Sequence, residues 1–172
     1  MADFFKSLPF VLENEGGKCD IPGDFGGRTN AGVSTPALRN FNSRHPELRF
    51  PDDPWALTND QIAIFYKMDY WKFNGLDSQS CATKIFDMGV NMGLPSGIKL
   101  AQKSANLCGQ DIAVDACYGP GTEAALNSCD PTQLMDNLIK VSCSHYDSIV
   151  ENHPGDQKFI NGWLRRARLI PN

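Results

Sequence analysis

Two carboxylates and a hydroxyl lie close together near the start of the chain. Glu15 ends an apolar run, Asp24 follows nine residues later in a glycine-rich stretch, and Thr29 lies five residues beyond Asp24. Cleavage of a glycosidic bond needs a carboxylic acid that protonates the leaving oxygen and a second group that activates water or stabilises the sugar carbon. The three residues therefore form a candidate sugar-cleaving site, with Glu15 as the acid.

A less specific interpretation fits each of these residues alone. A glutamate near the end of a helix is usually a solvated surface group. An aspartate in a glycine-rich turn usually binds the backbone of that turn. The combination of two acids and a hydroxyl over a short span favours the catalytic interpretation.

The local pattern predicts which elements hold these side chains. Apolar residues recur at a spacing of three to four over residues 3–14, which predicts an amphipathic helix. Residues 16–34 are rich in glycine and contain Pro22 and Asn30, a composition typical of turns between short strands. We therefore expect a small irregular β-hairpin directly after the first helix.

The rest of the chain predicts helices joined by loops. Ser34 or Thr35 is expected to cap a helix over residues 35–43, and Thr58 to cap one that runs to about residue 73. Further helices are predicted over residues 80–93, 97–107, 131–152 and 156–168, with another starting near residue 122. The expected fold class is mainly α with one small β element, and 172 residues suit one compact domain or a catalytic lobe with a helical partner.

Composition excludes several classes of function. The formal net charge is −4, which argues against nucleic-acid binding because that usually requires a basic face. An anionic polymer would have to be met by a local basic patch. The sequence contains no apolar stretch of about 18 residues, so we expect no membrane insertion.

The six cysteines do not indicate a metal site. None forms a Cys-x-x-Cys pair, and the three histidines are not at ligand spacing to them. Two interpretations stay open: disulfides formed in an oxidising compartment, or buried free thiols that pack as small apolar groups. The sequence does not select among the possible pairings.

Segments along nearly the whole chain resemble, in order, those of a known family. The first is Glu15-Gly16-Gly17 followed by Pro22-x-Asp24-x-Gly26-Gly27-x-Thr29-x-x-Gly32-Val33-Ser34. The others lie within residues 64–71, 85–93, 100–102, 119–122 and 159–166. Together they resemble glycoside hydrolase family 108, which includes phage-endolysin and secretion-activator muramidases.

The resemblance implies a lysozyme-like α fold with a small β-hairpin. It also implies hydrolysis of the β-1,4 bond between N-acetylmuramic acid and N-acetylglucosamine of peptidoglycan, without a metal or cofactor. The family's catalytic glutamate, in its Glu-Gly-Gly motif, falls on Glu15. The spacing of Glu15, Asp24 and Thr29 also resembles the triad of phage-type lysozymes, which implies Asp24 and Thr29 as partners.

The resemblance further implies a division of the chain. Residues 1–94 would form the catalytic lobe, and residues 95–172 a helical part similar to a peptidoglycan-binding region, packed on the first as one compact unit. Two departures stand out. Lys18-Cys19 replaces the usual tyrosine after Glu-Gly-Gly, and the longer loop from Cys108 to Cys117 suggests a stapled loop.

Three further residues are candidates for substrate binding. Asn91 is expected to line the cleft and bind a sugar N-acetyl group, or else to bridge backbone at a close helix contact. Tyr66 and Tyr70 are expected to border the sugar groove, because aromatic faces stack on sugar rings. The alternative is that these tyrosines belong to the core.

A peptidoglycan substrate implies action in the periplasm or cell wall. The start of the chain lacks the pattern of a classical signal peptide, so we expect export by a specialised secretion system or release through holin-type lysis. The first route fits an antibacterial effector with an immunity protein as partner, and the second an endolysin. Two other activities stay open: a lytic transglycosylase, and a non-catalytic module that binds the cell wall.

Overall fold

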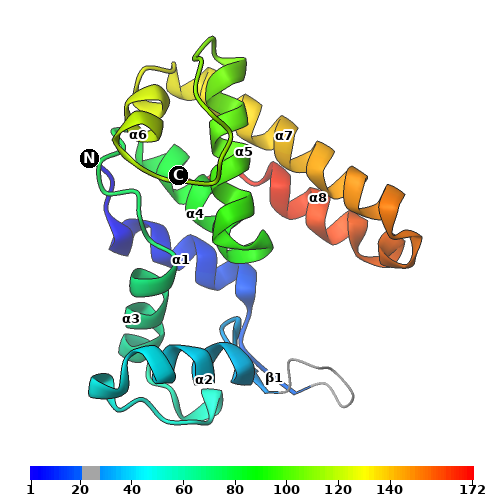
Figure 1. The fold of residues 1–172 in the computed structure, drawn as a ribbon. Coiled ribbons are helices and arrows are strands. Elements are labelled where there is room, and N and C mark those ends of the chain that lie inside the picture. The colour runs from blue at the N-terminus through cyan, green and yellow to red at the C-terminus, as the bar shows by residue number, and fades with distance from the viewer. Residues whose placement is uncertain (21–27) are drawn as a thin grey trace. The chain divides into compact units, whose positions relative to one another are not determined.

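The computed structural model describes residues 1–20 and 28–172, so the candidate Asp24 lies outside the described residues. Figure 1 shows that helices make up most of the fold. The helices are α1 (Phe4–Glu15), α2 (Thr35–Arg44), α3 (Asn59–Asp69), α4 (Gln79–Met92), α5 (Leu94–Leu107), α6 (Pro120–Asn127), α7 (Pro131–Asn152) and α8 (Ile160–Arg168). Short 3-10 helices cover Pro46–Leu48, Pro54–Ala56 and Pro154–Phe159.

The chain divides into two compact units. The smaller unit is Val11–Trp71, and the larger one combines Met1–Phe10 with Lys72–Asn172. Helix α1 therefore contributes its first part to the larger unit and its last part, with Glu15, to the smaller one. The division at residues 94 and 95 that the sequence suggests stays a prediction.

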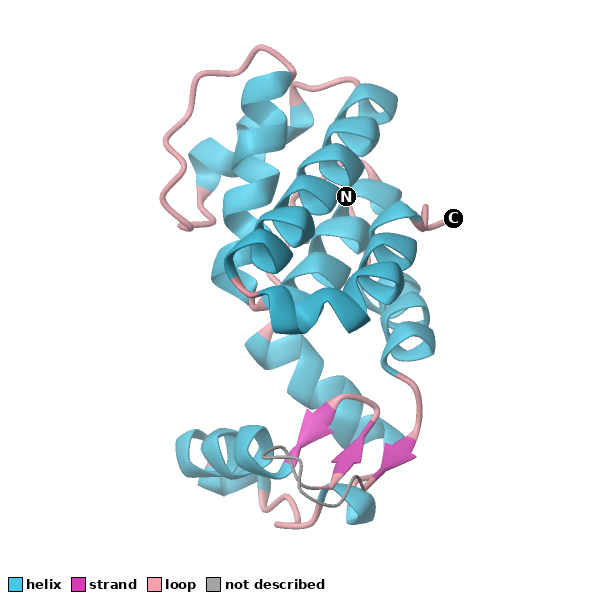
Figure 2. Cartoon of the chain, turned by 90° about the vertical axis from the view of Figure 1, so that its right-hand side faces the viewer, coloured by secondary structure: helices cyan, strands magenta, loops and turns pink. Residues whose placement is uncertain are grey.

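The smaller unit combines a three-stranded sheet with α2 and α3. Strands β1 (Lys18–Cys19), β2 (Thr29–Asn30) and β3 (Val33–Ser34) pair antiparallel in that order (Figure 2). Phe41 of α2 packs on Phe65 of α3 with ring centroids 5.1 Å apart, and both side chains are buried. This aromatic core joins α2 to α3, and α2 in turn packs on β3, whose Val33 is also buried.

The larger unit is a bundle in which α4, α5 and α7 pack on one another and α8 lies along α7 (Figure 1). Tyr146 of α7 stacks on Trp163 of α8, with centroids 5.4 Å apart. The buried carboxylate of Asp87 pairs with Arg166 at 2.9 Å. An aromatic stack and an ion pair thus attach the last helix, α8, to the rest of the bundle.

The loop after α5 is held by amide side chains. Asn106 both donates to and accepts from the backbone of Ile112, at 2.9 and 3.0 Å. The buried amide of Gln102 accepts from the backbone N–H groups of Asp115 and Ala116 and donates to the Cys117 carbonyl. The six cysteines carry free thiols in this structure. The loop for which the sequence suggests a disulfide is therefore held here by the hydrogen bonds of these two amides.

The expected fold class, mainly α with one small sheet, is confirmed. The helix predicted over residues 131–152 is Pro131–Asn152, and Ser34 caps α2 by accepting from the Ala37 N–H. Helix α3 ends at Asp69, before the predicted residue 73, because Tyr70 leaves the helical conformation with φ −121°. Helix α5 starts at Leu94, earlier than predicted, because a proline is tolerated in the first helical turn.

Candidate active site

A two-residue turn joins β2 to β3 and forms one wall of the candidate site. Ala31 and Gly32 both have positive φ, 47° and 79°, the combination found in type I′ hairpin turns. The hydroxyl of Tyr66, from α3, donates a hydrogen bond of 2.6 Å to the carbonyl of Ala31. The turn is therefore fixed both by strand pairing and by a side chain from a helix 35 residues further along the chain.

The carboxylate of Glu15 lies against this turn. A β-carbon placed on Gly32 would collide with a carboxylate oxygen of Glu15 and would lie 2.6 Å from the Tyr66 hydroxyl. Both contacts are closer than real β-carbons show. Position 32 therefore needs glycine because there is no room for a β-carbon and because its φ is positive. The half-buried acid at the end of α1 is thus brought next to the hairpin tip and to Tyr66.

Tyr70 also borders the acid. Burial raises the pKa of the Tyr70 hydroxyl, and the negative charges of Asp69 and Glu15 raise it further. Its ring centroid lies 5.7 Å from that of Tyr66. Arg44 of α2 binds both carboxylate oxygens of Asp69, at 3.0 and 2.6 Å, which fixes the end of α3 where the two tyrosines lie.

Thr29 lies on the central strand of the sheet. Its hydroxyl is 3.5 Å from the carbonyl of Cys19 on β1, and its own carbonyl accepts from the indole of Trp55 at 3.1 Å. Arg28 stacks over the Trp55 ring at 4.6 Å and pairs with Asp53 at 3.0 Å. The sheet and the Trp55 segment therefore position Thr29.

The predicted site residues divide between the two units. Glu15, Thr29, Tyr66 and Tyr70 belong to the smaller unit, where the structure brings Glu15 together with the two tyrosines. Asn91 belongs to the larger unit, and its side-chain oxygen accepts a hydrogen bond from the hydroxyl of Tyr146. The substrate-binding roles of Asn91, Tyr66 and Tyr70 stay predictions, as do the catalytic roles of Glu15, Asp24 and Thr29.

Sequence reasoning missed the special position of Gly32. The available signal was a small residue followed by glycine between two short strands, a pattern that favours a two-residue turn. The sequence also did not predict the hydrogen bond from Tyr66 to Ala31, because that contact depends on the tertiary fold. The Tyr66 side chain has only 2% of its surface exposed, and its hydroxyl end meets the turn.

Neither a metal centre nor a membrane span is found among the residues that the structure describes. Within them, no group of three or more His, Cys, Asp or Glu side chains is arranged to hold a metal ion. None of the described helices combines the length and the apolar character needed to cross a bilayer.

Comparisons with known proteins match both parts of the sequence. A family described as glycosyl hydrolase 108 matches residues 8–93, and one described as a predicted peptidoglycan domain matches residues 96–168. Among solved structures, SagA of Brucella abortus is similar, with a TM-score of 0.73 and 25% sequence identity; the match covers 95% of this chain and 88% of that one. No curated protein matches this chain.

Proposed function

Because this chain belongs to the glycosyl hydrolase 108 family, we propose that it is a muramidase that cleaves the β-1,4 bond between N-acetylmuramic acid and N-acetylglucosamine. At the coarser level, the chain is a glycoside hydrolase that acts on peptidoglycan. The observation that carries the finer proposal is the position of the Glu15 carboxylate, at the end of α1, against Gly32 and beside the Tyr66 hydroxyl.

In the proposed reaction Glu15 protonates the glycosidic oxygen as its bond to the sugar carbon breaks. Asp24, with Thr29, takes a proton from a water molecule whose oxygen bonds to that carbon. This route inverts the configuration and needs about 6.5–9.5 Å between the two carboxyl groups, whereas roughly 5–5.5 Å favours retention through a covalent intermediate. Tyr66 and Gly32 hold the acid in place without reacting.

A pair of isosteric variants tests the role of Glu15. We expect Glu15→Gln to lose activity on purified peptidoglycan by roughly a hundredfold or more, since an amide cannot supply the proton. Glu13→Gln is the matched control, because Glu13 is an exposed glutamate of the same helix. Lysis by Glu15→Gln at the wild-type rate would overturn the assignment.

Analysis of the products separates the proposal from its alternatives. A muramidase releases new reducing ends, whereas a lytic transglycosylase leaves 1,6-anhydro ends that mass spectrometry detects. Asp24→Asn should inactivate the hydrolase but spare a transglycosylase, which needs no activated water. Binding of intact peptidoglycan without any new ends would identify a non-catalytic wall-binding module.

The place of action is part of the same proposal. Peptidoglycan lies outside the cytoplasm, which supports action in the periplasm or cell wall, as a secreted antibacterial effector or an endolysin. We expect expression with a periplasmic leader to lyse a bacterial host and cytoplasmic expression to be tolerated, with Glu15→Gln as the inactive control. Co-expression of neighbouring genes would then reveal an immunity protein if one rescues the host.

A further inference from the structure

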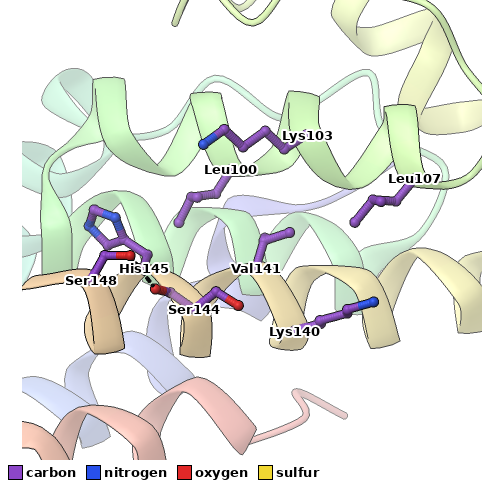
Figure 3. Close-up of a pocket in the computed structure, with 8 residues that line it drawn as sticks. All are labelled: Leu100, Lys103, Leu107, Lys140, Val141, Ser144, His145 and Ser148. Carbon is purple, nitrogen blue, oxygen red and sulfur yellow. Dashed lines mark hydrogen bonds between the residues drawn. The ribbon is translucent and has the colours of Figure 1, made fainter. Parts of the chain in front are cut away.

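A groove runs between α5 and α7 in the larger unit, with a volume of about 460 Å³. Figure 3 shows Leu100 and Leu107 on α5 and Val141 on α7 lying between the two helices. Leu107 is half exposed, so apolar surface faces water along this groove. The groove belongs entirely to the sequence segment matched by the peptidoglycan domain.

Two lysines give the groove a local positive charge. Lys103 of α5 and Lys140 of α7 line it and are exposed. Among the described residues, no carboxylate lies within ion-pair distance of either lysine. Asp136, one helical turn before Lys140, lines a different depression beside Met135. Two cations therefore face one groove of a protein whose net charge is −4.

One end of the groove is polar and uncharged. Ser144, His145 and Ser148 line it on α7 (Figure 3). Burial lowers the pKa of His145, and the nearby charge of Lys103 lowers it further. The imidazole is therefore neutral at pH 7 and offers one donor and one acceptor. The Ser148 hydroxyl donates to the Ser144 carbonyl at 2.9 Å, which leaves its oxygen as an acceptor.

We propose that this groove binds the stem peptide of peptidoglycan, with Lys103 and Lys140 pairing with peptide carboxylates and Leu107 and Val141 contacting its alanine methyl groups. The inference rests on the proposed function, because it names which part of the same substrate the second half of the chain recognises. The stem peptide is the proposed ligand because it combines small methyl side chains with several free carboxylates, which match the apolar and positively charged lining of the groove.

The glycan fits this groove less well. Sugar rings are usually held by the faces of aromatic side chains, and the groove has no tryptophan, tyrosine or phenylalanine in its described lining. The glycan also offers no free carboxylate when its lactyl groups are joined to peptide. The chemistry of the lining therefore favours the peptide over the sugar chain.

The test uses the full chain with Glu15→Gln and the soluble tripeptide L-alanyl-γ-D-glutamyl-meso-diaminopimelate as the probe. We expect a nuclear magnetic resonance titration to shift backbone signals of α5 and α7, centred on Lys103 and Val141. Adding Lys103→Glu and Lys140→Glu should weaken binding by roughly tenfold or more, since two attractions become repulsions. Lys6→Glu with Lys99→Glu is the control, because it makes the same charge change at exposed lysines outside the groove.

Several outcomes would overturn the proposal: shifts centred elsewhere, equal binding by the Lys103 and Lys140 variant, or tighter binding in the groove of peptide-free glycan. Lys103→Ala with Lys140→Ala, checked by circular dichroism, provides a milder variant if charge reversal disturbs folding. The titration does not depend on catalysis. Activity retained by Glu15→Gln would therefore refute the muramidase proposal alone, whereas an unmoved titration would refute the groove alone.

Discussion

The carboxylate of Glu15 occupies the space in which any residue other than glycine would carry its β-carbon at position 32. The two residues belong to different elements, the end of α1 and the turn between β2 and β3. Their contact means that the hairpin does more than connect strands. It sets how far the acid can move, so small changes at the turn should be felt at Glu15.

Gly32→Ala tests this relationship directly. The added methyl would collide with the Glu15 carboxylate, and alanine at φ 79° is strained by about 1 kcal/mol. We expect a large loss of peptidoglycan hydrolysis with a smaller fall in thermal stability. Gly17→Ala is the control, because a β-carbon there meets no atom within 4 Å. Equal activity of the two variants would contradict the role given to Gly32.

Tyr66→Phe tests whether the hydrogen bond from Tyr66 holds the turn between β2 and β3 in place. The variant removes the hydrogen bond to the Ala31 carbonyl, and we expect a loss of about 1–2 kcal/mol of unfolding free energy. If Tyr66 positions the turn, kcat should fall while KM on soluble glycan strands changes little. Tyr70→Phe, which keeps the neighbouring ring, should have the smaller effect on kcat. A rise in KM without a fall in kcat would instead support the predicted contact of Tyr66 with sugar.

The sequence predicted what depends on local pattern and missed what depends on tertiary contacts. The apolar spacing of residues 3–14 marks the helix that ends at Glu15, and Ser34 is a recognisable cap. In contrast, the bond between Asn91 and Tyr146 joins residues 55 positions apart, and nothing local in either helix indicates it. The contact of Glu15 with Gly32 likewise requires three elements to be assembled first.

Lys84 is the clearest case of a residue whose environment the sequence does not indicate. Lysine is rarely buried without partners, yet this side chain has 0% of its surface exposed. Its ammonium donates to the carbonyls of Arg166, Ala167 and Leu169, at 3.2, 2.7 and 2.8 Å. It therefore closes the end of α8, where unsatisfied carbonyl groups need donors.

The buried position of Lys84 predicts a pH dependence of stability. Burial lowers its pKa from 10.5 to about 8, against the favourable charge of Asp87. Between these values the folded chain has released the proton and the unfolded chain still holds it, so raising the pH favours folding. We expect the unfolding free energy of the wild type, relative to Lys84→Met, to rise between pH 8 and pH 10.5 by up to about 3 kcal/mol. Urea titrations at several pH values measure this difference, and a flat or falling difference would contradict the prediction.

Oxidation of the thiols should select one pair among the six cysteines. The Cys129 thiol donates to the Ala125 carbonyl at 3.2 Å. Burial raises the pKa of Cys129 to about 12, and the neighbouring Cys108 thiol contributes to the rise. The two residues follow α5 and α6, so a bond between them would join the ends of these helices. With oxidised glutathione as oxidant, we expect each bridge to form with loss of two hydrogens from the protein and release of two glutathione molecules. The closed loop should stabilise the larger unit by about 3 kcal/mol.

Peptide mapping without reductant identifies the bridge that forms. We expect a Cys108–Cys129 crosslink together with a higher melting temperature. Because a high pKa leaves little thiolate at neutral pH, the reaction should be slow without a thiol–disulfide oxidoreductase.

In the reduced protein, the exposed Cys19 and Cys117 should react with iodoacetamide well before the buried Cys81 and Cys129. A Cys108–Cys117 crosslink would instead support the stapled loop that the sequence suggests, and it would require the loop to leave the hydrogen bonds that Gln102 and Asn106 provide.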